Sequence, residues 1–509
     1  MKLKLILFLN FIFISFTSCS QEVNLLISDK QWKEDLIFLK EKVEKTFPSF
    51  QNSIHKNEFE RIFNETLSSD IQTIEKRVYA LQRVLNTLND EGCNIPLFQE
   101  GLDLQVLPIK PYWFNDGMYI LDASTDYREF IGKKITKING FSLEEVFEKT
   151  NNYLNADNDY YRSYLFQVYG FMPSLLKTIG LSEFTDQVVL ELNSEEQITM
   201  KAASISEYSK LDRKLPNDGY FNVKNKSYKG KNYWFELIPN TKTLFVQLQQ
   251  IVNDKKDNSF SKFVDTIEKL INTNKAEKLI IDIRYGGGGN GFKLKGFTDL
   301  LKSSKNINQK GKLFVLTSKA TRGTLLELAS ILNQNTKAIL VGEPTAEGVN
   351  TVGDITYITL PNSGLKASLT HTFWATSWKQ DNSTYLNPEI KVNYQYSDYK
   401  ENIDTWLTAV ENCKLNSDQQ QIPKEIAKQL EGTYKINGRK IAINTQGEQL
   451  FLTMNRKMKS FFEIKTELYF QSEGIISTDI KNVYLKYINN NGKINLNSLV
   501  WKKLELEIQ

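Results

Sequence analysis

The chain has 509 residues, of which 40% are hydrophobic and 24% charged. This length exceeds what one hydrophobic core supports, so the sequence predicts a globular protein of several domains. The formal net charge is only +4 because 64 basic residues are interleaved with 60 acidic ones, which excludes the strongly basic surface of a nucleic-acid-binding protein. Three cysteines (Cys19, Cys93 and Cys413) and two histidines (His55 and His371) form no metal-binding spacing, so we expect neither a metal nor a cofactor.

The N-terminus has the features of an export signal. Lys2 and Lys4 precede an apolar run over residues 5–16, which is shorter than the ~20 residues of a membrane-spanning helix. Small residues stand directly before Cys19, and they resemble a lipobox, where bacteria attach lipid to the new N-terminal cysteine. We therefore expect a signal peptide over 1–18 and a mature protein that is lipid-anchored in the cell envelope, in the periplasm or at the outer membrane. The alternative is an ordinary signal peptide with an incidental cysteine.

Residues 19–100 are predicted to form a helical region, because apolar residues recur at helical spacing from Trp32 to Leu88. From residue 101 the pattern changes to short strands, and one alternating strand ends in the hairpin turn Asn139-Gly140. A helix-like segment over 143–181 follows, and then further strands. We expect a β module with a cap over 101–240.

Residues 241–414 have the pattern of an α/β fold. The run from Leu279 to Arg284 begins with three apolar residues and contains a fourth at Ile283, as in a strand buried in a parallel sheet. Two similar strands, 314–316 and 338–341, flank a segment over 324–334 whose leucines share one helical face. This order predicts a strand–helix–strand crossover.

The last part of the chain is predicted to be a separate β domain. The polar stretch 415–424 is typical of a linker. Over 425–509, short alternating strands are separated by glycine and asparagine turns. We expect a small antiparallel sandwich or barrel there.

Four consecutive glycines, Gly286 to Gly289, directly follow the strand that ends near Arg284. Glycines let backbone N–H groups approach a ligand closely, as an anion or oxyanion site requires. No phosphate-binding glycine motif is present. A tight turn beside a closely packed neighbour is the alternative interpretation.

These segments together resemble the tail-specific, or C-terminal processing, serine proteases. Residues 281–284 with their glycines are similar to that family's Asp-Leu-Arg-x-Asn-x-Gly-Gly strand, and 341–345 to its Val-Gly-Glu-x-Thr motif. Residues 361–365 resemble the strand turn that follows, and the strand ending at Asn139-Gly140 resembles the PDZ-like module. The likeness runs from Trp32 to Trp406. It implies a multidomain α/β protein: an N-terminal helical region, a PDZ-like module and a tricorn-like peptidase core with a crossover of the ClpP/crotonase kind, followed here by the antiparallel β domain.

The resemblance also implies a serine nucleophile that opens the crossover helix, nineteen residues before the glycine of Val-Gly-Glu. At that distance from Gly342 this chain has Gly323. One branch of the family takes its base from a lysine after the same motif, where this chain has Ala346-Glu347-Gly348. Another branch takes a histidine from a turn after the N-terminal helices, where this chain has Gly92, or Cys93 if one residue is inserted. Nucleophile and base are therefore both expected to be missing.

The oxyanion donors implied by the resemblance are backbone N–H groups, of Gly288 or Gly289 and of Thr324, and these survive the loss of side chains. Acyl transfer also needs a nucleophile and a base, and removing either costs on the order of 10⁶ in turnover. Thr324, Cys93 and His371 are the candidates for a displaced catalytic set. A serine at position 323 alone is not expected to restore activity, because a serine without a base stays a weak nucleophile. Adding a histidine at position 92 restores the site only if the scaffold keeps its geometry.

Three functions remain open at this point. The favoured one is a non-catalytic pseudoprotease that binds unfolded or C-terminal peptide segments by adding them to a sheet edge. The second is an active endopeptidase of the serine type or with a displaced nucleophile. The third is a structural or interaction lipoprotein that acts through its C-terminal β domain.

The first prediction concerns the lipid anchor. Metabolic labelling with a fatty-acid analogue should tag the wild-type protein and miss the variant Cys19→Ala, because the acceptor is the cysteine itself. The variant Cys413→Ala is the matched control and should be tagged like the wild type. Equal tagging of all three proteins would contradict lipidation at Cys19.

Overall fold

The structure is a computed structural model of the chain, and it describes residues 23–24, 26–193, 196–212, 231–253, 259–414, 420–457 and 461–509. The predicted signal peptide, Cys19 and the first half of the predicted linker lie outside the described residues. Two compact units make up the chain. The first comprises Met1–Gly230, Thr351–Phe373 and Asn393–Thr405, and the second comprises Lys231–Asn350, Trp374–Val392 and Trp406–Gln509. Among the described helices, none is long and apolar enough to cross a membrane.

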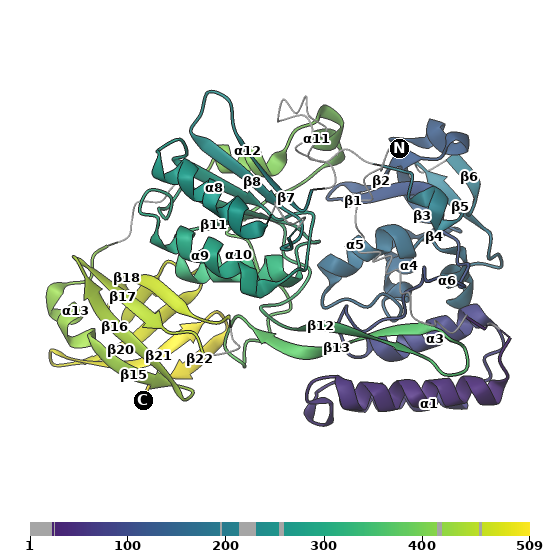
Figure 1. Cartoon of the computed structure of the whole chain (residues 1–509), viewed down its shortest axis with the longest axis horizontal. Helices are drawn as coiled ribbons and strands as arrows, with labels where there is room; N and C mark the ends of the chain where they lie inside the picture. The colour runs from purple at the N-terminus through teal and green to yellow at the C-terminus, as the bar shows by residue number, and fades with distance from the viewer. Residues whose placement is uncertain are drawn as a thin grey trace. The chain divides into compact units, whose positions relative to one another are not determined.

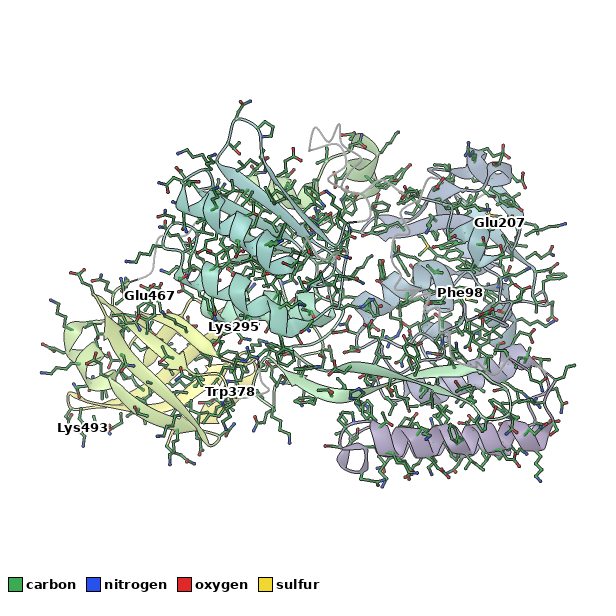
Figure 2. The ribbon with its side chains drawn as sticks, viewed as in Figure 1. Phe98, Glu207, Lys295, Trp378, Glu467 and Lys493 are labelled. Carbon is green, nitrogen blue, oxygen red and sulfur yellow. The ribbon has the colours of Figure 1, made fainter. Side chains whose placement is uncertain are left out.

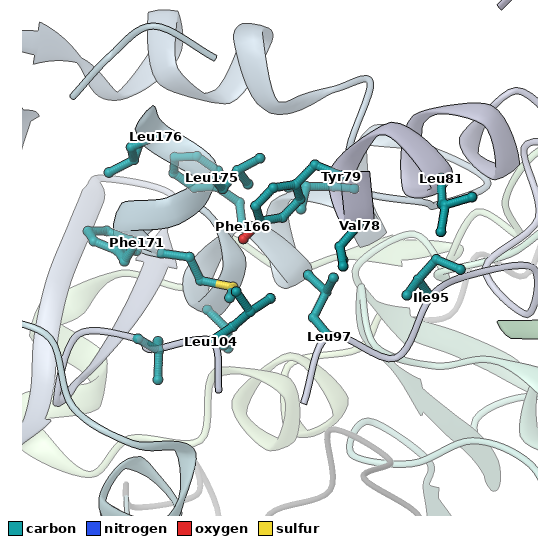
Figure 3. Close-up of a cluster of buried hydrophobic side chains, with 14 of the residues drawn as sticks. Val78, Tyr79, Leu81, Ile95, Leu97, Leu104, Phe166, Phe171, Leu175 and Leu176 are labelled. Atoms are coloured by element: carbon teal, nitrogen blue, oxygen red, sulfur yellow. The ribbon is translucent and has the colours of Figure 1, made fainter. Parts of the chain in front are cut away.

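The first unit begins with the predicted helices, which are α1 (Asp29–Thr46), α2 (Lys56–Ser68) and α3 (Ile74–Asn86). Ser28 caps α1 in a capping box with Gln31, which satisfies backbone donors at the start of the helix. Apolar side chains of α3 pack against those of α5 (Asp159–Tyr169) and α6 (Pro173–Thr178) in the buried cluster that Figure 3 shows. Within it, the hydroxyl groups of Tyr79 and Ser174 lie 2.8 Å apart.

An antiparallel sheet follows in the same unit. Its strand order is β1 (Ile109–Phe114), β2 (Gly117–Ala123), β3 (Lys134–Ile138), β5 (Gln187–Leu192) and β6 (Glu196–Lys201), with β4 (Phe141–Ser142) paired to β3. Asn139 and Gly140 have φ values of +50° and +84°, as the predicted turn between β3 and β4 requires. The predicted helix-like segment is broken into α4 (Leu143–Thr150), α5 and α6, and α7 (Ile205–Tyr208) lies beyond β6.

A long hairpin is formed by β12 (Asn350–Thr359) and β13 (Lys366–Ala375). Its turn is held by the buried carboxylate of Asp35 on α1, which accepts the backbone N–H groups of Asn362 and Ser363, both at 2.8 Å. A short bridge joins β13 to Asn94. The hairpin is thereby fixed to the N-terminal helices, and α11 (Tyr396–Glu401) completes the unit.

The second unit is built on a mostly parallel sheet of order β14-β11-β10-β9-β8-β7. Its strands are β7 (Tyr233–Leu237), β8 (Thr243–Leu248), β9 (Lys278–Asp282), β10 (Leu313–Thr317), β11 (Ile339–Gly342) and β14 (Ile390–Lys391). The helices around it are α8 (Phe260–Asn272), α9 (Leu294–Ser303), α10 (Gly323–Asn335) and α12 (Thr405–Glu411) (Figure 1). The predicted crossover from β10 through α10 to β11 is confirmed, since these strands pair in parallel.

The C-terminal part of the second unit is an antiparallel sheet preceded by α13 (Lys424–Leu430). Within the described residues its strands are β15 (Gly432–Ile436), β16 (Arg439–Gln446), β17 (Gln449–Met454), β18 (Ile464–Ser472), β19 (Ile475–Thr478), β20 (Val483–Asn490), β21 (Lys493–Trp501) and β22 (Leu504–Glu507). Each strand pairs with the next one. Lys435 and Gln509 exchange two backbone hydrogen bonds, which join the first strand to the end of the last. Of the two predicted forms, the domain is therefore the barrel rather than the sandwich.

Candidate functional site

A buried ion pair marks the end of β9. The guanidinium of Arg284 donates to both carboxylate oxygens of Asp282, each at 2.9 Å, and the two side chains are 1% and 0% exposed. Gln247 on β8 donates to the same carboxylate at 3.0 Å. The guanidinium carbon also lies 4.9 Å from the ring centre of Trp406. The bidentate pair and its additional partners offset the desolvation cost of burying two charges. Because the pair is held in one geometry, it fixes the direction in which the chain leaves β9.

The glycine loop that follows is packed against its neighbours. A Cβ atom at Gly286 would lie 2.1 Å from the carbonyl oxygen of Gln249, and one at Gly289 would lie 2.6 Å from the backbone nitrogen of Ile251. Close packing, the alternative interpretation of the glycines, therefore describes these two positions. Gly288 differs, because its φ is +87° and nothing lies within 4 Å of where its Cβ would be.

The structure places Gly323 beside this loop, at the first position of α10. Its φ is +53°, and a Cβ atom there would lie 2.9 Å from the backbone nitrogen of Gly288. Any side chain at position 323 would therefore meet the amide of Gly288, one of the predicted oxyanion donors. That Gly323 corresponds to the serine of the proteases stays a prediction, although its placement is what such a correspondence requires.

Thr324 stands one residue further along, and its hydroxyl group is already engaged. The hydroxyl donates to the carbonyl oxygen of Gly289 at 3.2 Å, and the side chain is buried. Its backbone N–H has no acceptor among the described residues, as is usual in the first turn of a helix. The geometry therefore favours Thr324 as a backbone donor, with Gly288 rather than Gly289, and counts against its hydroxyl as a displaced nucleophile.

Glu347 is a residue of the site whose role the sequence analysis missed. It lies in the segment where one branch of the family has lysine, and its carboxylate accepts the backbone N–H of Gly323 at 3.0 Å. The segment is held there because the N–H of Ala346 donates to the carbonyl oxygen of Thr321 at 2.9 Å. A negative charge at this place is stabilised by the N-terminal end of α10. The only sequence signal is an acidic residue two positions after the Val-Gly-Glu-x-Thr-like motif.

Gly92, in the first unit, has no space for a side chain. A Cβ atom there would lie 2.3 Å from the methyl group of Thr370 on β13 and 3.1 Å from the carboxylate of Asp90. A histidine at position 92 would therefore collide with Thr370, so the condition that the scaffold keeps its geometry is not met for that change. Such a side chain fits only if the Thr370 side chain gives way.

Cys93 is fully buried, and its sulfur lies 3.3 Å from the hydroxyl oxygen of Thr370. Burial, and next to it the negative charge of Asp90, raises the pKa of the Cys93 thiol well above its usual range. Since the thiolate is the reactive form, this cysteine is a poor nucleophile. It is a small core residue in this structure.

His371 is exposed on β13, and its Nδ1 lies 3.0 Å from the hydroxyl oxygen of its neighbour Thr372. In the part of the chain that the structure describes, this imidazole forms a hydrogen bond only with the adjacent, half-buried threonine. Among the described residues, no group of three or more His, Cys, Asp or Glu side chains is placed to hold a metal ion.

The turn that in some proteases carries the base here carries a buried acid. The carboxylate of Asp90 accepts the N–H of Gly92 at 2.8 Å and the hydroxyl of Thr370 at 3.0 Å. Burial raises the pKa of Asp90 to about 7. Burial and the charge of Asp90 also raise the pKa of Asp157, whose carboxylate accepts the N–H of Glu91. This pair was not predicted, because Asp157 lies far from Asp90 in the sequence.

No protein-family model matches the sequence, and no curated protein matches it. Among solved structures, a mutant form of CPAF aligns at 13% identity over 76% of this chain and 99% of its own, with a TM-score of 0.52. Mature CPAF aligns at 12% identity over 75% and 96%, with a TM-score of 0.50. A photosystem II D1 C-terminal processing protease aligns at 13% identity over 71% and 93%, with a TM-score of 0.35. The alignments with CPAF show a shared fold, and the predicted tail-specific-protease fold is confirmed.

The second prediction tests the backbone at position 323. The variant Gly323→Ala should lower the free energy of unfolding by about 1–2 kcal/mol, because a positive φ is unfavourable for a residue with a Cβ. The control is Gly296→Ala on α9, where nothing lies within 4 Å of the new methyl group. That variant should raise the free energy of unfolding by up to about 1 kcal/mol, as measured by urea denaturation. Equal effects of both variants would show that position 323 is not strained.

The third prediction concerns pH. Because the pKa of Asp90 is raised in the folded state, the folded protein binds a proton more tightly than the unfolded chain does. The free energy of unfolding should therefore fall as pH rises from about 4 towards 7. The variant Asp90→Asn should remove part of this slope, and the exposed control Asp103→Asn should keep it. Identical slopes in wild type and Asp90→Asn would contradict the assignment.

Proposed function

We propose that this chain is an exported, lipid-anchored member of the tail-specific protease family that binds peptide segments without cleaving them. The observation that carries the proposal is Gly323, where the site has a backbone but no nucleophilic side chain. The fold shared with CPAF and the motifs around β9 and β11 support membership of the family. The N-terminal residues up to Cys19 support export and lipidation.

The absence of catalysis follows from the surroundings of each candidate group. The hydroxyl of Thr324 donates a hydrogen bond to a carbonyl oxygen. A carbonyl oxygen is too weak a base to remove the hydroxyl proton, so this contact does not activate Thr324 as a nucleophile. Cys93 is a buried thiol whose pKa is raised, and Glu347 is bound to the amide of Gly323. None of these arrangements activates a nucleophile.

Binding rests on different atoms. Extended peptides are held by backbone N–H and C=O groups at sheet edges and by contacts with apolar side chains. The amides of Gly288 and Thr324 belong to the backbone and persist without a serine. A protein with this set of groups retains the means to hold an extended chain after it has lost the means to cut it.

The fourth prediction separates binding from cleavage. The purified mature protein should bind fluorescein-labelled casein, as measured by anisotropy, and should release no fragments from it. The variants Thr324→Ala, Cys93→Ala and His371→Ala should be equally inert, and an active serine protease serves as the positive control. Turnover by the wild type that disappears in one of these variants would establish a displaced catalytic group. Absence of any binding would remove the proposed function.

A further inference from the structure

Three aromatic side chains form a surface cluster next to the glycine loop. Phe292, Trp374 and Phe461 contact one another, with ring centres 5.4 to 5.9 Å apart. Phe292 is nevertheless 61% exposed, whereas Phe461 is buried beneath the other two. An exposed phenylalanine that contacts two further aromatic rings belongs to a contiguous apolar patch, and contiguous apolar patches can serve as binding sites.

The position of this aromatic cluster (Phe292, Trp374 and Phe461) is set by the glycine loop. Phe292 comes three residues after Gly289, and its backbone N–H is held by the side chain of Asn290 at 3.0 Å. A Cβ atom at Gly291 would lie 2.9 Å from the ring of Phe461, so loop and cluster are in contact. An extended chain that reaches the amides of the loop is therefore within a few residues of the cluster.

Phe461 belongs to the C-terminal barrel, and the barrel is firmly fixed to the peptidase core. The N–H of Phe461 donates to the carbonyl oxygen of Ala375 at 3.2 Å. Lys302 on α9 pairs with Glu463 at 2.6 Å. The buried carboxylate of Asp381 accepts hydrogen bonds from Trp501 at 3.2 Å and from Lys502 at 3.0 Å. The C-terminal domain thus contributes a side chain to the surface beside the site.

A positively charged side chain lies against the aromatic cluster. The guanidinium of Arg456 lies 4.4 Å from the ring centre of Phe461, and its side chain is exposed. Among the described residues, no carboxylate forms an ion pair with Arg456. Lys295 on α9, labelled in Figure 2, is by contrast paired with Asp299. Within the described part of the chain, Arg456 is therefore a positive charge beside the aromatic cluster that is available to a ligand.

We propose that the aromatic cluster and Arg456 bind an extended peptide segment in which an apolar side chain is followed by an acidic one. The apolar side chain packs on Phe292 and Trp374, and the acidic side chain pairs with the guanidinium. This inference rests on the proposed peptide-binding function and adds the sequence preference of the bound segment. It also assigns the C-terminal barrel a part in recognition, since it provides Phe461 and Arg456.

A peptide is favoured over a lipid surface because the aromatic cluster lies close to a backbone donor of the glycine loop. Among the described residues the N–H of Gly288, four residues before Phe292, has no acceptor, whereas the N–H of Asn290 donates to the carbonyl oxygen of Ile251 at 2.9 Å. A free backbone N–H can bind the carbonyl oxygen of an extended peptide. A membrane contact would need only the apolar and basic side chains. A peptide site should therefore bind peptides of different sequence with different affinity, whereas a membrane contact should not distinguish them.

The test uses the mature full-length protein and two fluorescein-labelled, C-terminally amidated peptides, Gly-Ser-Thr-Phe-Glu-Thr-Ser and the same peptide with Gln in place of Glu. Anisotropy should show that the wild type binds the first about three- to tenfold more tightly. Arg456→Gln should abolish this preference, and Phe292→Ser should weaken binding of both peptides about tenfold. The exposed controls Arg128→Gln and Phe184→Ser should match the wild type.

Each other outcome overturns the inference. If the wild type binds casein but does not distinguish the two peptides, or if Arg456→Gln keeps the preference, the inference fails while the proposed function stands. If the wild type binds no unfolded polypeptide, both fall. If Phe292→Ser and Arg456→Gln instead reduce binding to vesicles of phosphatidylglycerol and leave peptide binding unchanged, the cluster is a membrane contact.

Discussion

The buried pair of Asp282 and Arg284 is the interaction on which the rest of the site depends. Two charges in the interior are costly unless every donor and acceptor is satisfied, so their geometry tolerates little change. Arg284 stacks on Trp406, whose indole N–H donates to the carbonyl oxygen of Thr317 at 2.9 Å. The same indole occupies the space beside Gly342, where a Cβ atom would lie 2.3 Å from its nitrogen. The two motifs that resemble the proteases are thus linked through one tryptophan, which fixes where the glycine loop and the segment before Glu347 begin.

The sequence predicted the elements whose signal is local. Continuous apolar runs and helical spacing identified β9, β10, α10 and β11, and the turn Asn139-Gly140 was predicted from its residue types. It did not predict how Glu347 reaches Gly323, because that contact depends on tertiary packing and leaves only one acidic residue as a trace. The barrel closes through backbone hydrogen bonds of Lys435 and Gln509, and such bonds leave no mark on residue type. For this reason a sandwich and a barrel were equally compatible with the sequence.

The two positions expected to carry nucleophile and base, Gly323 and Gly92, are tightly constrained by their surroundings in this fold. At Gly323 the left-handed backbone suits glycine and would be strained for serine. At Gly92 the space of a side chain is filled by Thr370, which donates its hydroxyl to the buried Asp90. In both places a Cβ atom would come within 3 Å of a neighbouring atom, at 2.9 Å for Gly323 and 2.3 Å for Gly92. Introducing a side chain at either position therefore works against the fold.

A site of this kind separates affinity from turnover. In a working protease, a contact raises the catalytic rate only if it is stronger in the transition state than in the bound substrate. A contact that merely holds the substrate tightly does not raise this rate. In the non-catalytic binding protein proposed above, this limit would not apply, and additional contacts would only lengthen the time for which a segment stays bound. A phenylalanine such as Phe292, exposed on an aromatic base beside the glycine loop, is a contact of this type. On the proposed function, the packing of the barrel against the core has a purpose, because it brings Phe461 and Arg456 to the surface proposed to hold the peptide.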